Sequence, residues 1–489
     1  MSKKIKLLDL LMYLMETVDS PKHVGALLTF EAAARAPTRT AAAIVAAYRA
    51  AKAVPPFNYV PDLSIRALPS FRPVRSMDMD YHVQHLVLPA GASQKELLKL
   101  VADLHEPMLD RNRPGFRVHV IEGLPGQGLA IYLKVHHGLV DGQSVMARIV
   151  ASLNDAVNSR QMTPFYAVEF ADTPLKAPGG FVDRLAALQS SGWSQTVALK
   201  DFYVGAVKKG VERLLNKGAT GSLPFAAPRL QTNEAIRTPR NFAILSLPLA
   251  EMKTAGKAFG GTINDAAATV TAAGLTRYLQ ARGSVPKQPL VAMCPVSLRS
   301  PGDTEATTKA SAVFVPLGAT RSTVGERMRE VVVAMTAAKQ DMRAMSNHSA
   351  MIYGISAISL GELVESSRLN LLSNPLANYV LSNVPGTPDA KFLNGARMTG
   401  LFPISALAAG IGLNVTLSSY AGSIDFGFVG NGLSMPDLSE LADCTRAAFD
   451  ELKAAALEAA TPSAAKQRAE RPKRVRVAGA SSGKQRAKK

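Results

Sequence analysis

One stretch of the chain joins a predicted strand to a dense set of reactive side chains: Lys134-Val135-His136-His137-Gly138-Leu139-Val140-Asp141-Gly142. Residues 129–133, just before it, have the branched and aromatic content that is typical of a β-strand. If the strand continues into the histidines, its period of two places His137 on the apolar face and His136 toward more polar surroundings. Because the two imidazoles then point to opposite sides, we expect them to have different roles.

His137 is the candidate for acid–base chemistry. The unperturbed pKa of histidine, about 6.5, lets it accept a proton at neutral pH. An imidazole that follows an apolar face inward is costly unless it has a partner or a task. Gly138 and Gly142 permit a tight loop, so Asp141 can fold back on the imidazole or bind a cation that fixes the loop. The alternative, two structural histidines in a hydrogen-bonded turn, stays open at this point.

The length of the chain indicates more than one domain. With 489 residues it exceeds what one hydrophobic core usually serves, and strands and helices follow one another in a loosely similar order in both halves. We therefore expect two α/β layers facing each other. The sequence predicts a first domain at 1–216, a linker rich in Gly, Pro, Thr and Asn at 217–240, a second domain at 241–462, and a basic disordered tail at 463–489.

Charge and cysteine content exclude several classes of protein. The two cysteines, Cys294 and Cys444, lie in separate apolar patterns, so neither a disulfide framework nor a cysteine metal site is expected. We expect both to be reduced thiols in the cytosol. The net charge of the chain is +18. The tail from 466 to 489 contains ten Lys or Arg and one Glu, so it contributes half of that net charge. That tail and the basic amphipathic segment 207–215 either bind anionic headgroups or only keep the chain in solution. No folded nucleic-acid reader accompanies them, so no nucleic acid is expected.

We expect no membrane-spanning helix and no signal peptide. Asp9 and Glu16 interrupt the apolar amino terminus. The uncharged stretch 398–424 is long enough to span a bilayer, but Pro403 and several glycines indicate two buried strands and a turn.

Other elements are predicted from local signals. Ser93 with Glu96, and Thr262 with Asp265, have the spacing of capping boxes that open helices. A strand at 380–384 is expected to end in a turn in which Pro385 fixes the first central position and Gly386 permits the positive φ of the second.

Several motifs occur in one order along the chain. They are His136 to Gly142, Thr262-Ile263-Asn264-Asp265, Pro295-Val296-Ser297-Leu298-Arg299, Ser382-Asn383-Val384-Pro385-Gly386, Leu413-Asn414-Val415-Thr416 and Ser419-Tyr420-Ala421-Gly422, after an opening Glu16-Thr17, Pro21 and His23-Val24-Gly25. Together they resemble the bacterial wax ester synthase/diacylglycerol acyltransferase family, from about residue 5 to residue 455. The resemblance implies the two-domain fold of CoA-dependent acyltransferases such as chloramphenicol acetyltransferase, with mixed sheets flanked by helices and a tunnel between the halves.

The resemblance also implies acyl transfer from acyl-CoA to the hydroxyl of diacylglycerol or of a long-chain alcohol. His137 is then the general base, and no metal and no cofactor beyond the acyl-CoA substrate is needed. Asn264, Ser382 and Asn383 are unranked candidates for donors to the developing oxyanion. By analogy with the fold, Asp141 is expected to form a buried salt bridge to Arg299, while His136 and Gly142 support the loop. Because both substrates are poorly soluble, the protein is expected in the cytoplasm, peripherally associated with the inner membrane or with lipid droplets.

Two departures from the family pattern leave alternatives open. The chain has Pro114-Gly115-Phe116 where the family often has Pro-Leu-Trp, and Ala310-Ser311 where it often has Gly-Asn. We expect neither to touch the histidines. The alternatives are condensation or transacylation with a carrier protein or another hydroxyl acceptor, and a non-catalytic homologue that binds lipid.

Overall fold

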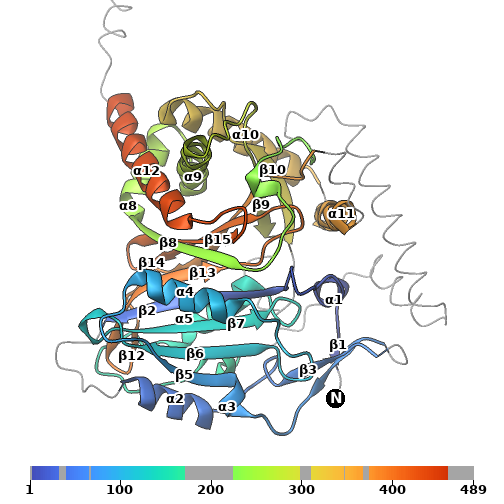
Figure 1. The fold of residues 1–489 in the computed structure, drawn as a ribbon, viewed down its shortest axis with the longest axis vertical. Helices are drawn as coiled ribbons and strands as arrows, with labels where there is room; N and C mark the ends of the chain where they lie inside the picture. Colours follow the sequence, from blue (N-terminus) through green and yellow to red (C-terminus); the bar gives the residue numbers. More distant parts are fainter. Residues whose placement is uncertain are drawn as a thin grey trace, which may run out of the picture.

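The computed structural model describes residues 3–31, 40–64, 68–170, 224–297, 310–345, 347–366 and 374–460. Within these residues the chain forms two six-stranded sheets and one three-stranded sheet, with helices packed against them (Figure 1). Both large sheets are mixed, because each contains parallel and antiparallel neighbours. The predicted α/β fold with two mixed sheets is therefore confirmed.

The first large sheet carries the two histidines. Its strand order is β12-β13-β2-β7-β6-β5. The bounds are β2 (His23–Glu31), β5 (Val83–Val87), β6 (Phe116–Glu122), β7 (Leu129–His136), β12 (Phe392–Leu393) and β13 (Ala396–Ile404). Strands β6 and β7 form the predicted antiparallel hairpin, and β7 lies between β6 and β2. A small sheet beside it consists of β1 (Lys3–Lys4), β4 (Ser70–Pro73) and β3 (Tyr59–Asp62).

Two strands of this first sheet come from the second half of the sequence. Strand β13 pairs antiparallel with β2, with Met398 opposite Phe30 and Ile404 opposite Gly25. In Figure 1 it lies at the boundary between the lower, blue-to-cyan half and the upper, green-to-red half. The Asp425 carboxylate of the second sheet accepts a hydrogen bond from the Leu401 N–H of β13 at 2.8 Å. The division of the sequence at 217–240 stays a prediction, and the sheets interlock across it.

The second large sheet has the order β10-β9-β11-β14-β15-β8. The bounds are β8 (Arg240–Pro248), β9 (Val291–Ser297), β10 (Ala310–Pro316), β11 (Tyr379–Thr387), β14 (Leu413–Tyr420) and β15 (Ser423–Asn431). The predicted turn at Pro385-Gly386 is wrong, because β11 continues to Thr387 through a register shift after Val384. Gly386 does not have a positive φ. A Cβ there would lie 2.1 Å from the Ser419 carbonyl oxygen, so the glycine permits close approach of the neighbouring strand.

The helices flank the sheets, and α8, α9, α10 and α12 cover one face of the second sheet (Figure 1). Their bounds are α1 (Leu7–Leu14), α2 (Thr40–Ala50), α3 (Met79–His82), α4 (Gln94–His105), α5 (Gly142–Ser152), α8 (Leu249–Ala258), α9 (Ile263–Ala281), α10 (Val324–Arg343), α11 (Asn347–Ser366) and α12 (Leu438–Ala460). Short 3-10 turns occur at Pro125–Gln127, Phe165–Ala167 and Gln231–Asn233.

Both predicted capping boxes are confirmed. In each, the hydroxyl accepts a hydrogen bond from the backbone three residues on, and the acidic side chain accepts one from the N-cap backbone. Helix α11 was not anticipated, because its apolar residues are spread around the helix and form no clear stripe.

Some predicted features lie outside the described residues: the basic segment 207–215, the tail 466–489 and Arg299. Among the helices of the described part, none is both long enough and apolar enough to cross a membrane.

Candidate active site

The two histidines of the motif occupy different environments, but not the ones predicted. His136 is the last residue of β7 and is almost completely buried, with 1% of its surface exposed. His137 is only partly buried and lies in the wall of a cavity. The alternation of the strand does not extend to His137, because β7 ends one residue earlier. The His137 N–H still donates a hydrogen bond to the Lys22 carbonyl at 2.8 Å, so the chain turns while its backbone stays tied to β2.

A cavity of about 690 Å³ lies between the two halves and contains most of the predicted site residues. His137, Asp141 and Gly142 line it from the first half, and Asn264, Ser382 and Asn383 line it from the second. Its apolar wall includes Met12, Val24, Met146, Met293, Val380 and Leu407. Side chains that stand about 125 or 245 positions apart in the sequence therefore meet in one space.

The surroundings of the His137 ring favour its neutral form. Burial lowers its pKa below the ordinary value, while the Asp141 carboxylate and the backbone carbonyl of His137 itself act in the opposite direction. The Nδ1 atom is buried, which leaves Nε2 as the ring nitrogen available to a ligand in the cavity that His137 lines. A neutral imidazole nitrogen beside an apolar cavity can accept a proton from a bound substrate.

Asp141 has a visible structural task. It is the N-cap of α5, and its side chain accepts a hydrogen bond from the Ser144 N–H at 2.9 Å. Its predicted partner Arg299 lies outside the described residues, so that salt bridge stays a prediction. Gly142 is the first residue of α5, and a Cβ built on it would meet no atom within 4 Å. The start of α5 therefore leaves space beside His137.

Two amides from the second half line the same cavity as His137. Asn264 is in the first turn of α9 and Asn383 is in β11. The Asn383 Nδ2 donates a hydrogen bond to the Asn264 Oδ1 at 2.7 Å. This contact uses the oxygen of Asn264 and leaves its Nδ2 group without a hydrogen-bond partner among the described residues. The Nδ2 group of Asn264 is thus available to a ligand, and its role as a donor, which was suggested from the sequence, stays a prediction.

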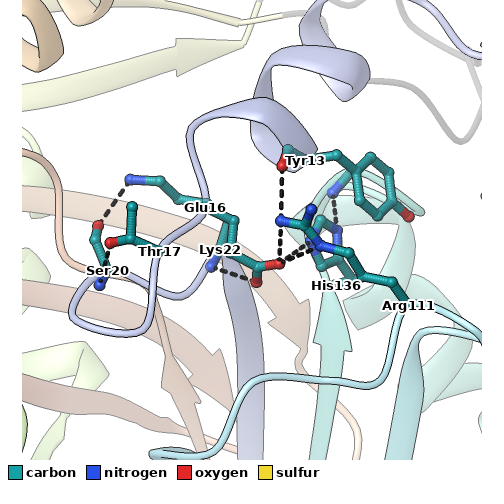
Figure 2. A network of polar contacts seen from close by, with 8 residues as sticks. Tyr13, Glu16, Thr17, Ser20, Lys22, Arg111 and His136 are labelled. Atoms are coloured by element: carbon teal, nitrogen blue, oxygen red, sulfur yellow. Dashed lines mark hydrogen bonds and ion pairs between the residues drawn. The ribbon is translucent and has the colours of Figure 1, made fainter. Parts of the chain in front are cut away.

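A buried carboxylate behind the histidines was missed as a site residue. Glu16 lies after α1, its side chain is fully buried, and it contacts three groups (Figure 2). Its Oε1 accepts from the Lys22 N–H at 3.1 Å. Its Oε2 lies 3.0 Å from Arg111 Nη2 and 3.4 Å from His136 Nε2. Burial alone would raise the pKa of Glu16, but these contacts outweigh it and lower the pKa to about 2.

In the sequence, Glu16 interrupts an apolar amino terminus and belongs to the opening Glu16-Thr17 of the family resemblance, but neither observation gave it a role beside the histidines. That interruption was the available signal, because an acidic residue in an apolar run is costly to bury unless it has partners.

One departure from the family pattern does touch a histidine, against expectation. The Gly115 carbonyl accepts a hydrogen bond from the His136 N–H at 2.8 Å. A Cβ on Gly115 would lie 3.0 Å from the His136 Cβ. At the other departure, the Ser311 hydroxyl donates to the Ala350 carbonyl at 2.6 Å and so ties β10 to α11.

The cavity also carries positive charge. Lys339 and Arg343 are four residues apart on α10, hence on one side of that helix, and both line the cavity. Lys339 Nζ lies 3.6 Å from Asp265 Oδ1. Arg343 is exposed and forms no ion pair with any residue that the structure describes. Across the cavity, Lys22 Nζ is paired with Glu362 of α11 at 2.8 Å, so that charge is already compensated.

Comparison with known proteins identifies the family. Residues 5–267 match the model of the wax ester synthase/diacylglycerol acyltransferase catalytic domain, and residues 308–453 match the C-terminal domain of the same family. The chain belongs to this family. The resemblance inferred from the motifs is thereby confirmed.

Individual relatives agree. A probable diacylglycerol O-acyltransferase of Mycobacterium tuberculosis is 31% identical over 460 residues, which cover 92% of this chain and 96% of the relative. A wax ester synthase/diacylglycerol acyltransferase of Marinobacter aquaeolei superposes with a TM-score of 0.74 at 26% identity, over 93% of this chain and 99% of that one. The first condensation domain of the CDA synthetase shares the fold, with a TM-score of 0.56 at 15% identity, over 94% and 97%.

The pKa of His137 predicts how activity depends on pH. The resemblance implies that His137 is the general base, which works only when neutral; on that expectation kcat/KM should rise with pH through a His137 pKa that lies below its ordinary value, and then level off. The Asp141 charge favours the protonated ring. Asp141→Asn should therefore move the half-maximal point to lower pH, while the asparagine oxygen keeps the hydrogen bond that caps α5.

The measurement is kcat/KM against pH for the wild type and the variant. Asp103→Asn, on the exposed face of α4, is the matched control and should leave the profile unchanged. A half-maximal point that stays in place or moves upward in Asp141→Asn would contradict the assignment.

Proposed function

We propose that this enzyme transfers a fatty acyl group from acyl-CoA to the hydroxyl of diacylglycerol or of a long-chain alcohol, with His137 as general base. The observation that carries the proposal is the position of His137, which lines a largely apolar cavity between the halves and has its Nδ1 buried. The names of the relatives, diacylglycerol O-acyltransferase and wax ester synthase, support this choice of substrates.

The reaction needs only one proton to be moved. The hydroxyl oxygen attacks the thioester carbonyl carbon while His137 Nε2 takes the hydroxyl proton. The carbon–sulfur bond then breaks, CoA leaves as a thiolate, and the imidazolium returns the proton to sulfur. The products are the ester and CoA, and no covalent enzyme intermediate forms.

The carbonyl oxygen becomes negative during the attack and needs a hydrogen-bond donor. Asn264 is the best candidate of the three named from the sequence. Its oxygen is occupied by Asn383, so its Nδ2 is the group left to donate. Asn383 holds Asn264 through this hydrogen bond, and Ser382 lines the same cavity.

The basic pair on α10 suits the donor substrate. CoA carries several phosphate charges, and Lys339 and Arg343 are the cavity cations with weak or absent ion pairs among the described residues. We assign them to the phosphates of acyl-CoA. The apolar wall of the cavity then remains for the acyl chain and the acceptor.

Contact with a lipid surface is part of the proposal, in the cytoplasm at the inner membrane or at lipid droplets. Leu14, Val18 and Leu363 are apolar residues with more than half of their surface exposed. They belong to α1, to the segment after it and to α11, the two regions that the Lys22–Glu362 ion pair joins beside the cavity. In the sequence, ten basic residues at 466–489 add attraction to anionic headgroups, about 1 kcal/mol for each one near the surface.

The role of His137 predicts the effect of its removal. His137→Ala should lower kcat by about 10²–10⁴, the usual contribution of a general base, because no other group takes the proton. The unfolding midpoint should stay close to that of the wild type, since the backbone hydrogen bond to Lys22 does not need the ring. His85→Ala, on β5 at the opposite edge of the sheet, is the control and should keep full activity. The readout is ester formation from palmitoyl-CoA with diacylglycerol or hexadecanol, and full activity of His137→Ala would refute the proposal.

The phosphate assignment predicts a change in KM for one substrate only. Lys339→Ala with Arg343→Ala should raise KM for palmitoyl-CoA by about tenfold or more, because charge-assisted hydrogen bonds contribute ~1.5–3 kcal/mol each. KM for palmitoyl-pantetheine, which lacks the nucleotide, should not change. Arg329→Ala is the matched control on α10, since its guanidinium packs over Phe259. Equal effects on both thioesters would contradict the assignment.

Deletion of 466–489 tests the tail. The truncated chain should sediment less with vesicles of anionic phospholipid and equally with zwitterionic vesicles, because the effect is electrostatic. Its activity on detergent-dispersed substrates should be unchanged. Undiminished binding to anionic vesicles would show that the tail serves only solubility.

A further inference from the structure

We propose that Glu16 is a positioning residue for His137, and that it acts through the main chain of Lys22 and the ring of His136. The inference rests on the proposed role of His137 as general base. Figure 2 shows the residues involved, which come from three separate parts of the first half: the segment after α1, the start of β2 and the end of β7, together with Arg111.

The first connection runs through Lys22. The Lys22 N–H donates to Glu16 Oε1 at 3.1 Å, and the Lys22 carbonyl accepts from the His137 N–H at 2.8 Å. A single residue therefore links the carboxylate to the backbone of the general base. The Lys22 side chain is held as well, by the Ser20 hydroxyl at 2.9 Å and by Glu362 at 2.8 Å. Movement of Glu16 would be passed on to His137 through this one residue.

The second connection runs through His136. Its ring is stacked on Tyr13, with centroids 3.9 Å apart and planes 6° apart. Its Nδ1 accepts a hydrogen bond from the Gly138 N–H at 3.0 Å, so that nitrogen carries no proton. The ring proton is then on Nε2, which lies 3.4 Å from Glu16 Oε2. The Gly138 N–H thus fixes the tautomer of His136, and the Glu16 carboxylate lies beside the ring nitrogen that carries the proton.

Only a carboxylate suits this position. Glu16 faces three kinds of donor: the Lys22 N–H, the Arg111 guanidinium and the His136 ring. Two oxygens with acceptor capacity on both sides can serve all of them. A glutamine has one acceptor oxygen, so its amino group would face either the Lys22 N–H or the Arg111 and His136 donors. Its low pKa keeps Glu16 charged throughout any practical assay range.

Glu16 does not exchange protons with substrate, and it is not among the charges that shift the His137 pKa. Its loss should therefore reduce the rate at all pH values and leave the half-maximal pH in place. The opposite behaviour is expected for Asp141, whose charge raises the pKa of the ring against the larger effect of burial. The pH profile thus separates a residue that positions His137 from one that tunes it.

The experiment compares Glu16→Gln with Glu106→Gln in the full-length enzyme. Glu106 is the control because it is another glutamate that accepts from a backbone group, the Arg240 N–H at 3.0 Å, and none of its contacts among the described residues is with the histidine loop. In Glu16→Gln we expect kcat to fall about 100-fold, as for a small misplacement of a catalytic group. KM should stay within about threefold, and the half-maximal pH should be unchanged. Glu106→Gln should keep kcat within about threefold of the wild-type value, even if it lowers the unfolding midpoint as much as Glu16→Gln does.

A second readout is independent of turnover. Modification of His137 by diethyl pyrocarbonate, followed by peptide mass spectrometry, should be faster in Glu16→Gln and unchanged in Glu106→Gln. If His137→Ala proves active, the proposed function fails, but this rate still tests the positioning. Should Glu16→Gln not fold, Arg111→Lys removes the paired contact while keeping the charge, and the same loss of kcat is expected. Wild-type kcat in a folded Glu16→Gln, or the same loss in both glutamates, would overturn the inference.

Discussion

The pairing of β13 with β2 is the constraint on which the rest of the structure depends. It brings residues 396–404 into the sheet that carries the histidines. The same strand is bound to the second sheet, since the Leu401 N–H donates to Asp425. The two halves are therefore held at a fixed separation, and the cavity between them keeps its walls. A site assembled from both halves requires such a fixed relation, because a displacement of about 1 Å can cost 10²-fold in rate.

The chemistry is divided between the halves. The first half supplies the imidazole and the carboxylates around it, and the second supplies the amides and the basic residues of α10. Behind the histidines, the Glu16 carboxylate is fully buried, while its partner Arg111 keeps 39% of its side chain exposed. The carboxylate itself is thus shielded from water and held by several contacts, while the side that receives substrate is a largely apolar cavity.

Local patterns predicted a good part of this arrangement. The β6–β7 hairpin, the capping boxes at Ser93 and Thr262 and the two-layer α/β architecture each follow from a few neighbouring residues. The environments of His136 and His137 did not follow, because a period of two holds only inside a strand and β7 ends at His136. Pro385-Gly386 has the composition of a turn, yet it continues β11 because of a neighbouring backbone that the local sequence does not reveal.

Long-range contacts were harder still. Nothing near Glu16 in the sequence points to Arg111 or His136, because their meeting is decided by how β2 and β7 are placed. The role of Gly115 was missed for the same reason, since its carbonyl meets His136 only once β6 and β7 pair. The family resemblance supplied the function where the local patterns stopped.

The crossing strand also governs the order in which the molecule can be completed. Until residue 404 has left the ribosome, β2 is the edge of an unfinished sheet, with its backbone groups open to any other strand. A fragment that ends at the predicted linker would keep β2 as an unpaired edge strand, although it contains both histidines. The first sheet is thus completed only after residues from both halves have been synthesised, and the amino-terminal half does not form that sheet by itself.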